Sequence, residues 1–305
     1  MATVPNPVAQ PLGGPTLSGT NITVDVLVNP PTRIPEIIRN LVAANRGYFA
    51  ERIFATPGMT VQGGAIIYDE SFPEDHFLPD DQSIAPRAPG TEAPRLGSTR
   101  REPKVARPES WSGSIEVTDE ARRRNQVASV QRQFTQAANS FANKIQARAI
   151  ETLVDFVTAA SRTVTGINWR AALSDGVVNA DPATLPQQTF ALVNKQFQTD
   201  EAGMQADLLL INPADSFYLR LIYGNKLQEL LDSYGLTMLE SPRVTEGDPI
   251  FVKEGGVGVM AFEKPLDQEY TREGTRKTDV YTLEVQPVFV ANDASAIVVA
   301  SGVNS

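Results

Sequence analysis

The sequence predicts an α+β fold in which one long helix and one long extended loop stand beside a compact region of helices and strands. The first observation is a helical pattern at 119–160, where apolar residues recur at steps of mostly three and four and form one stripe. The second is a proline-rich segment, residues 51–118, that contains two strand-like stretches. The third is the alternation of helix-like and strand-like segments after residue 186. A long helix beside an extended arm indicates a building block rather than an enzyme.

Composition restricts the possible functions. The 305 residues, 41% of them hydrophobic, suffice for one large or two modest domains with a real core. No apolar run approaches the ~18 residues of a membrane span, and the N-terminus lacks a signal-peptide pattern, so we expect no membrane partner. The absence of cysteine excludes disulfides and thiolate metal sites and is consistent with a reducing cytoplasm. The net charge of −9 argues against a protein that wraps nucleic acid.

Residues 1–50 are expected to form an N-terminal arm. Six prolines and several glycines fall within residues 1–32, which does not suit a compact core segment. Within this stretch, residues 22–28 (Ile-Thr-Val-Asp-Val-Leu-Val) read as a strand that pairs with something outside itself. A short helix is expected from about Pro35.

Residues 51–118 are expected to form an extended two-stranded excursion. Strand-like sequence appears at 65–68 and at 112–117, and seven prolines lie between these stretches. So many prolines prevent a regular hydrogen-bonded ladder. A structureless stretch of this length is unusual inside a compact domain. We therefore expect the excursion to lie across another subunit.

Charges are segregated along this excursion. Residues 69–81 hold six acidic residues and no lysine or arginine, whereas residues 87–107 hold six basic residues against two acidic ones. One interpretation is a solvated loop, since charge runs usually face water. The other is complementarity between neighbouring copies, in which an acidic patch meets a basic one. The twelve candidate intersubunit contacts are Asp69, Glu70, Glu74, Asp75, Asp80, Asp81, Arg87, Arg95, Arg100, Arg101, Lys104 and Arg107.

The helical pattern at 119–160 opens with a capping hydroxyl, Thr118, and two carboxylates at the positive end of the helix dipole, Asp119 and Glu120. An unbroken helix over this range would be roughly 63 Å long at ~1.5 Å per residue. Helices in globular domains usually have ~8–20 residues. We therefore expect this helix to be the spine of the fold, followed by a turn-rich segment at 163–186.

The remaining chain is expected to form a compact α/β region and a closing pair of strands. The expected elements are helices at 187–197 and at 214 to about 231, strands at 207–211, 280–290 and 296–299, and two strands within 249–262.

The sequence contains no recognisable catalytic, cofactor or metal site. His76 is the only histidine, so a Ser–His–Asp triad would have to use it, yet it falls in an acidic, proline-flanked loop without packed support. The acidic run lacks the spacing of a calcium loop, and the glycines at 255–258 lack the lysine of a phosphate-binding loop. Three arginines at 122–124 are weak evidence for nucleic-acid binding in an acidic chain. We expect no enzyme and no cofactor.

The linear order of these parts resembles that of the major capsid proteins of tailed phages with the Hong Kong 97-type fold. The resemblance covers nearly the whole chain and is carried by residues 118–160, by the strand-to-helix junction at 207–213 (with Leu-Leu-Ile-Asn-Pro) and by residues 281–299 (with Asn-Asp-Ala-Ser-Ala-Ile). It implies an N-arm at 1–50, an E-loop at 51–118, a P-domain with the spine helix at 119–185, an A-domain at 186–275 and a return to the P-domain at 276–305.

The resemblance also implies a function. Such subunits form pentamers and hexamers that close into an icosahedral virion capsid around double-stranded DNA, without sequence-specific binding, in the host cytoplasm. A separate scaffolding protein, a portal and decoration proteins are the implied partners. Some members join subunits through a lysine–asparagine isopeptide bond; Lys104 and Asn292 match no family motif for it, and an ordinary basic contact is the simpler role for Lys104.

Two other classes of shell or virion protein stay open. One is an encapsulin-type shell of the same fold that holds a cargo enzyme, although the proline-rich loop and arm favour the phage capsid. The other is a virion structural protein without icosahedral symmetry, such as an adhesin or a tail component.

Overall fold

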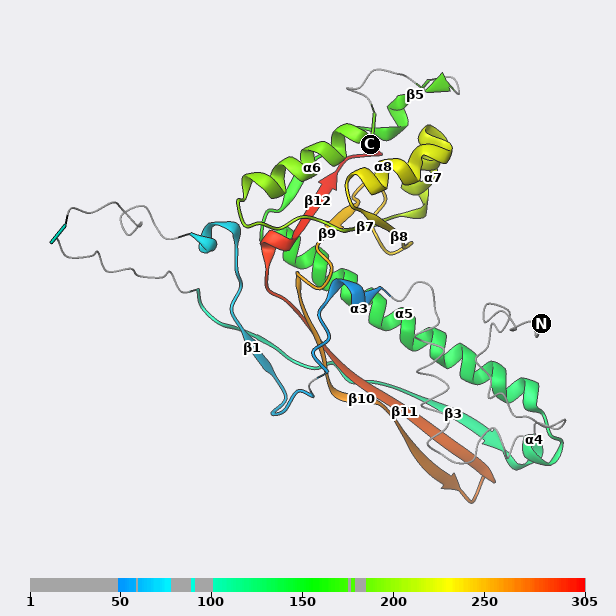
Figure 1. Ribbon diagram of the computed structural model, residues 1–305. Coiled ribbons are helices and arrows are strands. Elements are labelled where there is room, and N and C mark those ends of the chain that lie inside the picture. The colour runs from blue at the N-terminus through cyan, green and yellow to red at the C-terminus, as the bar shows by residue number, and fades with distance from the viewer. Residues whose placement is uncertain are drawn as a thin grey trace, which may run out of the picture.

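A long helix runs across the molecule and connects two sheets (Figure 1). The computed structural model describes residues 49–58, 60–77, 89–90, 101–174, 177–178 and 185–304. The strand expected at 22–28 and the helix expected from Pro35 lie outside these residues. No helix in the described ranges is both long and apolar enough to cross a membrane.

The spine helix is α5, Val127–Ala159, with 33 residues and therefore a length of roughly 50 Å. The prediction of an unbroken helix from residue 119 was wrong, because a separate short helix, α4 (Asp119–Arg123), precedes it. Thr118 caps α4 as expected by accepting a hydrogen bond from the Ala121 amide. Asn125 between the two helices has φ 49°, a left-handed conformation that asparagine tolerates better than most residues. Residues 119–126 contain no large apolar side chain, so no packing force holds them in line with the stripe.

A three-stranded antiparallel sheet covers the first half of α5. Its order is β10–β11–β3, formed by Gly258–Glu273, Thr278–Ala291 and Trp111–Thr118. The helix buries Val130, Phe134 and Phe141 against apolar residues of β3 and β11. The strand expected at 112–117 is confirmed, and it belongs to this sheet, where it pairs with β11. The strand expected at 65–68 pairs elsewhere: β1 (Ile66–Tyr68) forms a separate ladder with β2 (Lys104–Ala106).

A five-stranded mixed sheet lies at the other end of α5. Its order is β4–β12–β9–β7–β8, and its strands are Thr163–Thr165, Ile297–Ser301, Ile250–Val252, Leu208–Ile211 and Thr237–Glu240. The strands expected at 207–211 and 296–299 are confirmed here, and the two expected within 249–262 are confirmed as β9 and the start of β10.

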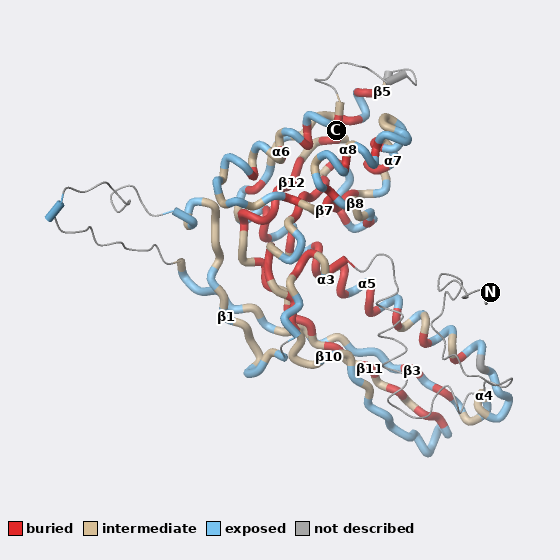
Figure 2. The backbone as a smooth tube through the Cα atoms, in the orientation of Figure 1, coloured by how far each residue is buried: buried red, intermediate tan, exposed pale blue. Residues whose placement is uncertain are grey.

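Helices cover both faces of this sheet because its side chains alternate between two cores. Leu208 and Leu210 pack with the second half of α5 and with α3 (Ala50–Ile53). Leu209 and Ile211 pack on the opposite face with α6 (Gln187–Thr199), α7 (Pro213–Tyr223) and α8 (Leu227–Ser233). All four residues of β7 are therefore buried. Figure 2 shows that buried residues are concentrated in the five-stranded sheet and the helices beside it.

The helix expected at 187–197 is confirmed as α6, whereas the one expected from residue 214 to about 231 is interrupted. Asn212 caps α7 by accepting a hydrogen bond from the Ala214 amide, and α7 ends at Tyr223 because the next residue, Gly224, has a φ of 51°. A short 3-10 turn, Gly224–Lys226, then leads into α8. Three other 3-10 turns, Pro73–His76, Trp169–Ala172 and Ala294–Ala296, and a small ladder of Leu173–Ser174 with Val177–Val178 complete the described elements.

Candidate assembly surface

The ladder of β1 and β2 is the base of the excursion predicted at 51–118. Three residue pairs form it: Ile66 with Ala106, Ile67 with Val105 and Tyr68 with Lys104. An isolated two-stranded ladder is marginally stable in water, so other contacts must hold it in place. Ile67 and Val105 lie directly opposite each other and are 73% and 55% exposed, which leaves an apolar cross-strand pair on the surface.

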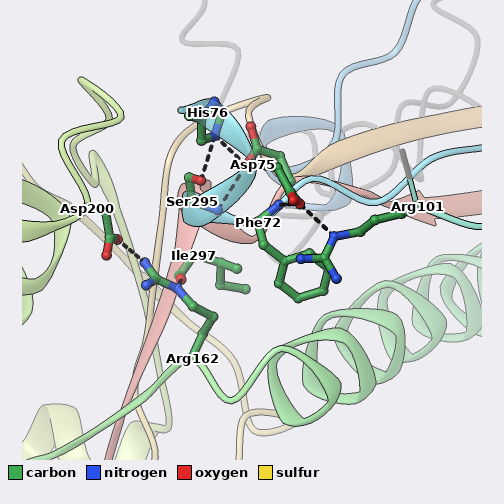
Figure 3. Close-up of polar contacts among 9 residues, drawn as sticks. Phe72, Asp75, His76, Arg101, Arg162, Asp200, Ser295 and Ile297 are labelled. Carbon is green, nitrogen blue, oxygen red and sulfur yellow. Dashed lines mark hydrogen bonds and ion pairs between the residues drawn. The ribbon is translucent and has the colours of Figure 1, made fainter. Parts of the chain in front are cut away.

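Ion pairs between the two segments of the excursion stabilise this base. Arg101 donates from Nε to Asp75 at 2.6 Å and from its terminal nitrogen to Glu74 at 2.6 Å, and its guanidinium lies 4.0 Å from the centre of the Phe72 ring. Figure 3 shows Arg101 reaching across to Asp75 beside that ring. The hydrogen bond from Arg101 holds the pKa of Asp75 below its usual value. Lys104 donates to Glu70 at 2.6 Å.

The base is attached to the body at the junction between β11 and β12. Ser71 donates from its amide to the carbonyl of Asn292 at 2.6 Å and accepts from the amide of Ala294 at 2.9 Å. The His76 Nε2 lies 2.8 Å from the hydroxyl of Ser295, which is fully buried (Figure 3). The prediction that His76 has no packed support was therefore wrong, because the C-terminal segment reaches it from 219 residues away.

The geometry around His76 does not form a catalytic triad. A triad histidine contacts its serine and its carboxylate through different ring nitrogens. Here the same atom, Nε2, lies 2.8 Å from Ser295 and 4.0 Å from Asp293. The arrangement fits a structural anchor for the 3-10 turn of residues 73–76. Within the described ranges, no group of three acidic, histidine or cysteine side chains could hold a metal ion.

The twelve candidate intersubunit contacts fall into three groups. Five of them pair with one another inside the chain: Glu70, Glu74, Asp75, Arg101 and Lys104. Asp69 and Arg107 form no ion pair with another residue in the described ranges. The other five, Asp80, Asp81, Arg87, Arg95 and Arg100, lie outside those ranges. Contact between acidic residues of one copy and basic residues of a neighbouring copy stays a prediction.

A cleft of about 590 Å³ separates the ladder from the spine helix. Glu70 and Lys104 line one wall, and Arg148 and Phe156 of α5 line the other. Arg148 donates to Glu109 at 2.8 Å and to Glu151 at 3.0 Å, which links the spine helix to the chain that leads into β3. The ion pair of Lys104 with Glu70 therefore lies in the lining of this cleft.

Sequence reasoning missed the apolar pair and the pairing partner of β1. Residues 104–106 form only a three-residue strand between two prolines, Pro103 and Pro108, which gave no strand signal. Ile67 and Val105 are exposed because of the register in which β1 pairs with β2. Three residues per strand are too few for sequence periodicity to predict that register.

A spine helix that connects a three-stranded and a five-stranded sheet, with a charged loop anchored beside it, is the architecture of a capsid subunit of the Hong Kong 97-type. Residues 101–300 match the family model described as phage capsid protein, which is more than half of the chain. The chain therefore belongs to the phage capsid protein family. It is a structural protein of the tailed-phage major capsid type, a component of the virion and not an enzyme.

Solved structures show the same fold at low sequence identity. A structure from Mycobacterium phage Bobi is 11% identical, with a TM-score of 0.58 over 84% of this chain and 90% of the other. The capsid of Myoviridae phage XM1 is 12% identical, with a TM-score of 0.55 over 83% and 90%. A virus-like particle from Pyrococcus furiosus is 10% identical, with a TM-score of 0.55 over 88% and 98%. The sequence has no match among curated proteins.

Proposed function

We propose that copies of this chain assemble into pentamers and hexamers that close into an icosahedral shell around double-stranded DNA. The observation that carries the proposal is the exposed pair Ile67 and Val105 on the anchored β1–β2 ladder. Burial of this apolar pair by another subunit would remove both side chains from water, which favours association. A neighbouring copy is the partner that the capsid family supplies.

We assign the segments of the chain as an N-arm at 1–50, an E-loop at 51–118, a P-domain at 119–185 and 276–305, and an A-domain at 186–275. The spine helix supports the position of the P-domain, and the helices α6, α7 and α8 support that of the A-domain. The three-stranded sheet joins strands from three of these segments, so the E-loop is continuous with the P-domain through β3.

The proposed interior is DNA held without sequence-specific contacts. A net charge of −9 favours this, because a strongly basic lining would grip DNA that must be packed and later released. We further propose a separate scaffolding protein, a portal and decoration proteins as partners, with assembly in the host cytoplasm.

A second candidate function is an encapsulin-type shell that holds protein cargo. The similarity to the virus-like particle from Pyrococcus furiosus, which covers 98% of the other chain, supports a closed particle built from this fold. The two functions differ in what the shell contains rather than in how the subunit folds.

Negative-stain electron microscopy of the purified protein, with and without co-expressed assembly partners, tests the proposal. Closed shells, or rings of five and six copies, are the expected result, and nuclease-protected DNA inside would support the phage function. Shells that hold protein and no DNA would favour the second candidate. Fibres or trimers would point to a virion component without closed symmetry, and a monomer under all conditions would overturn both shell functions.

A further inference from the structure

The two outer edges of the three-stranded sheet differ in how they are protected against pairing with a further strand. The outer edge of β10 is bridged at Val259 and Phe262 by residues 55 and 60 of the same chain. Farther along, β10 carries Pro265 and two register shifts between Phe262 and Asp267. Bridging segments, prolines and bulges are devices by which proteins block pairing at a sheet edge.

Among the residues that the structure describes, none of these devices protects the outer edge of β3. Its eight residues pair with β11 in one continuous register, without a bulge. The strand contains no proline and one charged residue, Glu116, and its exposed positions include Ser112, Gly113 and Ser114. No strand or bridge in the described part of the chain pairs with this edge. An edge left in this state is a template for another strand.

A groove follows this unprotected edge. Its volume is about 590 Å³, and residues 110–115 form one wall while Ala137, Ser140, Phe141 and Lys144 of α5 form the other. A Cβ atom placed on Gly113 would lie 3.8 Å from the Phe141 ring, so the odd-numbered positions of β3 face the helix. Ser112 and Ser114 consequently point to the other, exposed face. A strand added here would place every second side chain over α5.

We propose that residues 22–28 of a neighbouring copy occupy this groove as a fourth strand on β3. Their sequence, Ile-Thr-Val-Asp-Val-Leu-Val, puts Ile22, Val24, Val26 and Val28 on one face, which suits the apolar side over α5. The other face carries Thr23, Asp25 and Leu27, next to the exposed Ser112 and Ser114. Added strands of this kind gain affinity from main-chain hydrogen bonds and specificity from alternate side chains.

The choice of a neighbouring copy rests on the proposed shell function. Twenty residues, 29–48, separate this segment from Phe49 in the core. Extended, they span up to roughly 66 Å at ~3.3 Å per residue, which exceeds the length of the spine helix. The linker is therefore long enough for the segment to meet a neighbouring copy, and exchange of identical arms joins copies without requiring a new surface.

The absence of cysteine makes disulfide trapping unambiguous. One tagged chain carries Ser114→Cys, and a second, untagged chain carries Thr23→Cys, Asp25→Cys or Leu27→Cys, so that three registers are sampled. A disulfide requires Cα atoms about 4.4–6.8 Å apart. After co-assembly and mild oxidation, we expect a reducible band of tagged plus untagged chain for at least one register. The matched control, Val24→Cys with Ser114→Cys, points to the opposite face and should lose this band.

Three other outcomes would overturn the inference. Assembled particles without the mixed band in any register would show that residues 22–28 do not dock on β3. An equally strong band from the Val24→Cys control would show random collision rather than a defined strand. The third outcome concerns a single chain that carries both Ser114→Cys and Asp25→Cys. If its disulfide forms only within one chain, the segment docks on its own subunit. Failure of the cysteine-free protein to form any particle would instead count against the shell function, so the two failures are distinguishable.

Discussion

Arg101 donates a hydrogen bond from Nε to Oδ2 of Asp75 at 2.6 Å, across 26 residues of the predicted E-loop. The contact joins the outgoing and returning segments of the excursion, and Glu74 and Phe72 bind the same guanidinium. Because the two hydrogen bonds to separate carboxylates and the stacking on Phe72 all depend on a planar guanidinium, lysine would not reproduce this arrangement. Three residues that the sequence predicts as contacts between copies, Glu74, Asp75 and Arg101, thus join the two segments of the loop within one copy.

Arg101→Glu should impair assembly more than folding. The change places a third carboxylate beside Glu74 and Asp75, whereas the ion pairs that are lost lie near solvent and contribute little to the stability of the monomer. Particle yield by sedimentation and the urea midpoint of the monomer measure the two effects. Arg101→Lys, which keeps the charge, should assemble with an intermediate yield. Normal yield from Arg101→Glu would contradict this role.

Replacing Ile67 and Val105 together by serine should prevent assembly and leave the monomer intact. Both side chains are mostly exposed, so the free energy of unfolding should change by about 0.5 kcal/mol or less. Light scattering of the assembling protein and thermal melting of the monomer test the prediction. The exchange Ile67→Val with Val105→Ile keeps the apolar pair and is the control. Equal assembly of the serine and exchange variants would remove the pair from the interface.

Asp200→Ala should be strongly destabilising because it leaves Arg162 buried without its partner. The Arg162 guanidinium lies 2.5 Å from Asp200 and 3.3 Å from the carbonyl of Ile297, and both charged side chains are less than 10% exposed (Figure 3). Removing one member of a buried pair typically costs about 3–5 kcal/mol. Urea denaturation measures the loss. Glu240→Ala, which breaks the exposed pair with Arg220, is the control and should cost about 1 kcal/mol or less.

Gly258→Ala should disrupt the start of β10, whereas Gly274→Ala at the other end should be tolerated. A Cβ on Gly258 would lie 1.8 Å from the carbonyl oxygen of Val290, so the backbone of β10 or β11 must move. A Cβ on Gly274 has no neighbour within 4 Å. We expect a loss of about 3 kcal/mol or more for the first variant and about 0.5 kcal/mol or less for the second. Thermal melting compares them, and equal melting temperatures would refute the steric argument.

Acid should weaken the contact between β10 and β11 through Glu284. Hydrogen bonds from Lys264, Ser110 and Gln286 lower the pKa of Glu284 from 4.5 to about 2. A lowered folded-state pKa means that the stabilisation is fully present above the unfolded value and is lost as pH falls from about 4.5 to about 2. Melting temperatures of the native protein and of Glu284→Gln, taken between pH 2 and 7, should therefore converge in acid. A constant difference across that range would show that Glu284 does not contribute through its charge.

Local pattern alone determined the spine helix and most of the strands. The apolar stripe of α5 repeats over nine turns, and the apolar run at 207–211 is bounded by a capping asparagine and a proline. Each of these signals comes from residues that are close together in the chain, so it can be recognised from the sequence alone. The resemblance to tailed-phage capsid proteins also came from the linear order of the elements, and the family match confirms it.

Only the tertiary structure decided which distant segments meet. Periodicity did not show that β3 pairs with β11 rather than within the loop, that His76 is held by Ser295, or that Arg162 finds Asp200. It also missed the break at Asn125, where a left-handed residue ends a continuous helical pattern. Residues in these pairs are far apart in the sequence and meet only when the chain between them folds around a common core. The sequence near either residue does not specify which distant residue it will contact.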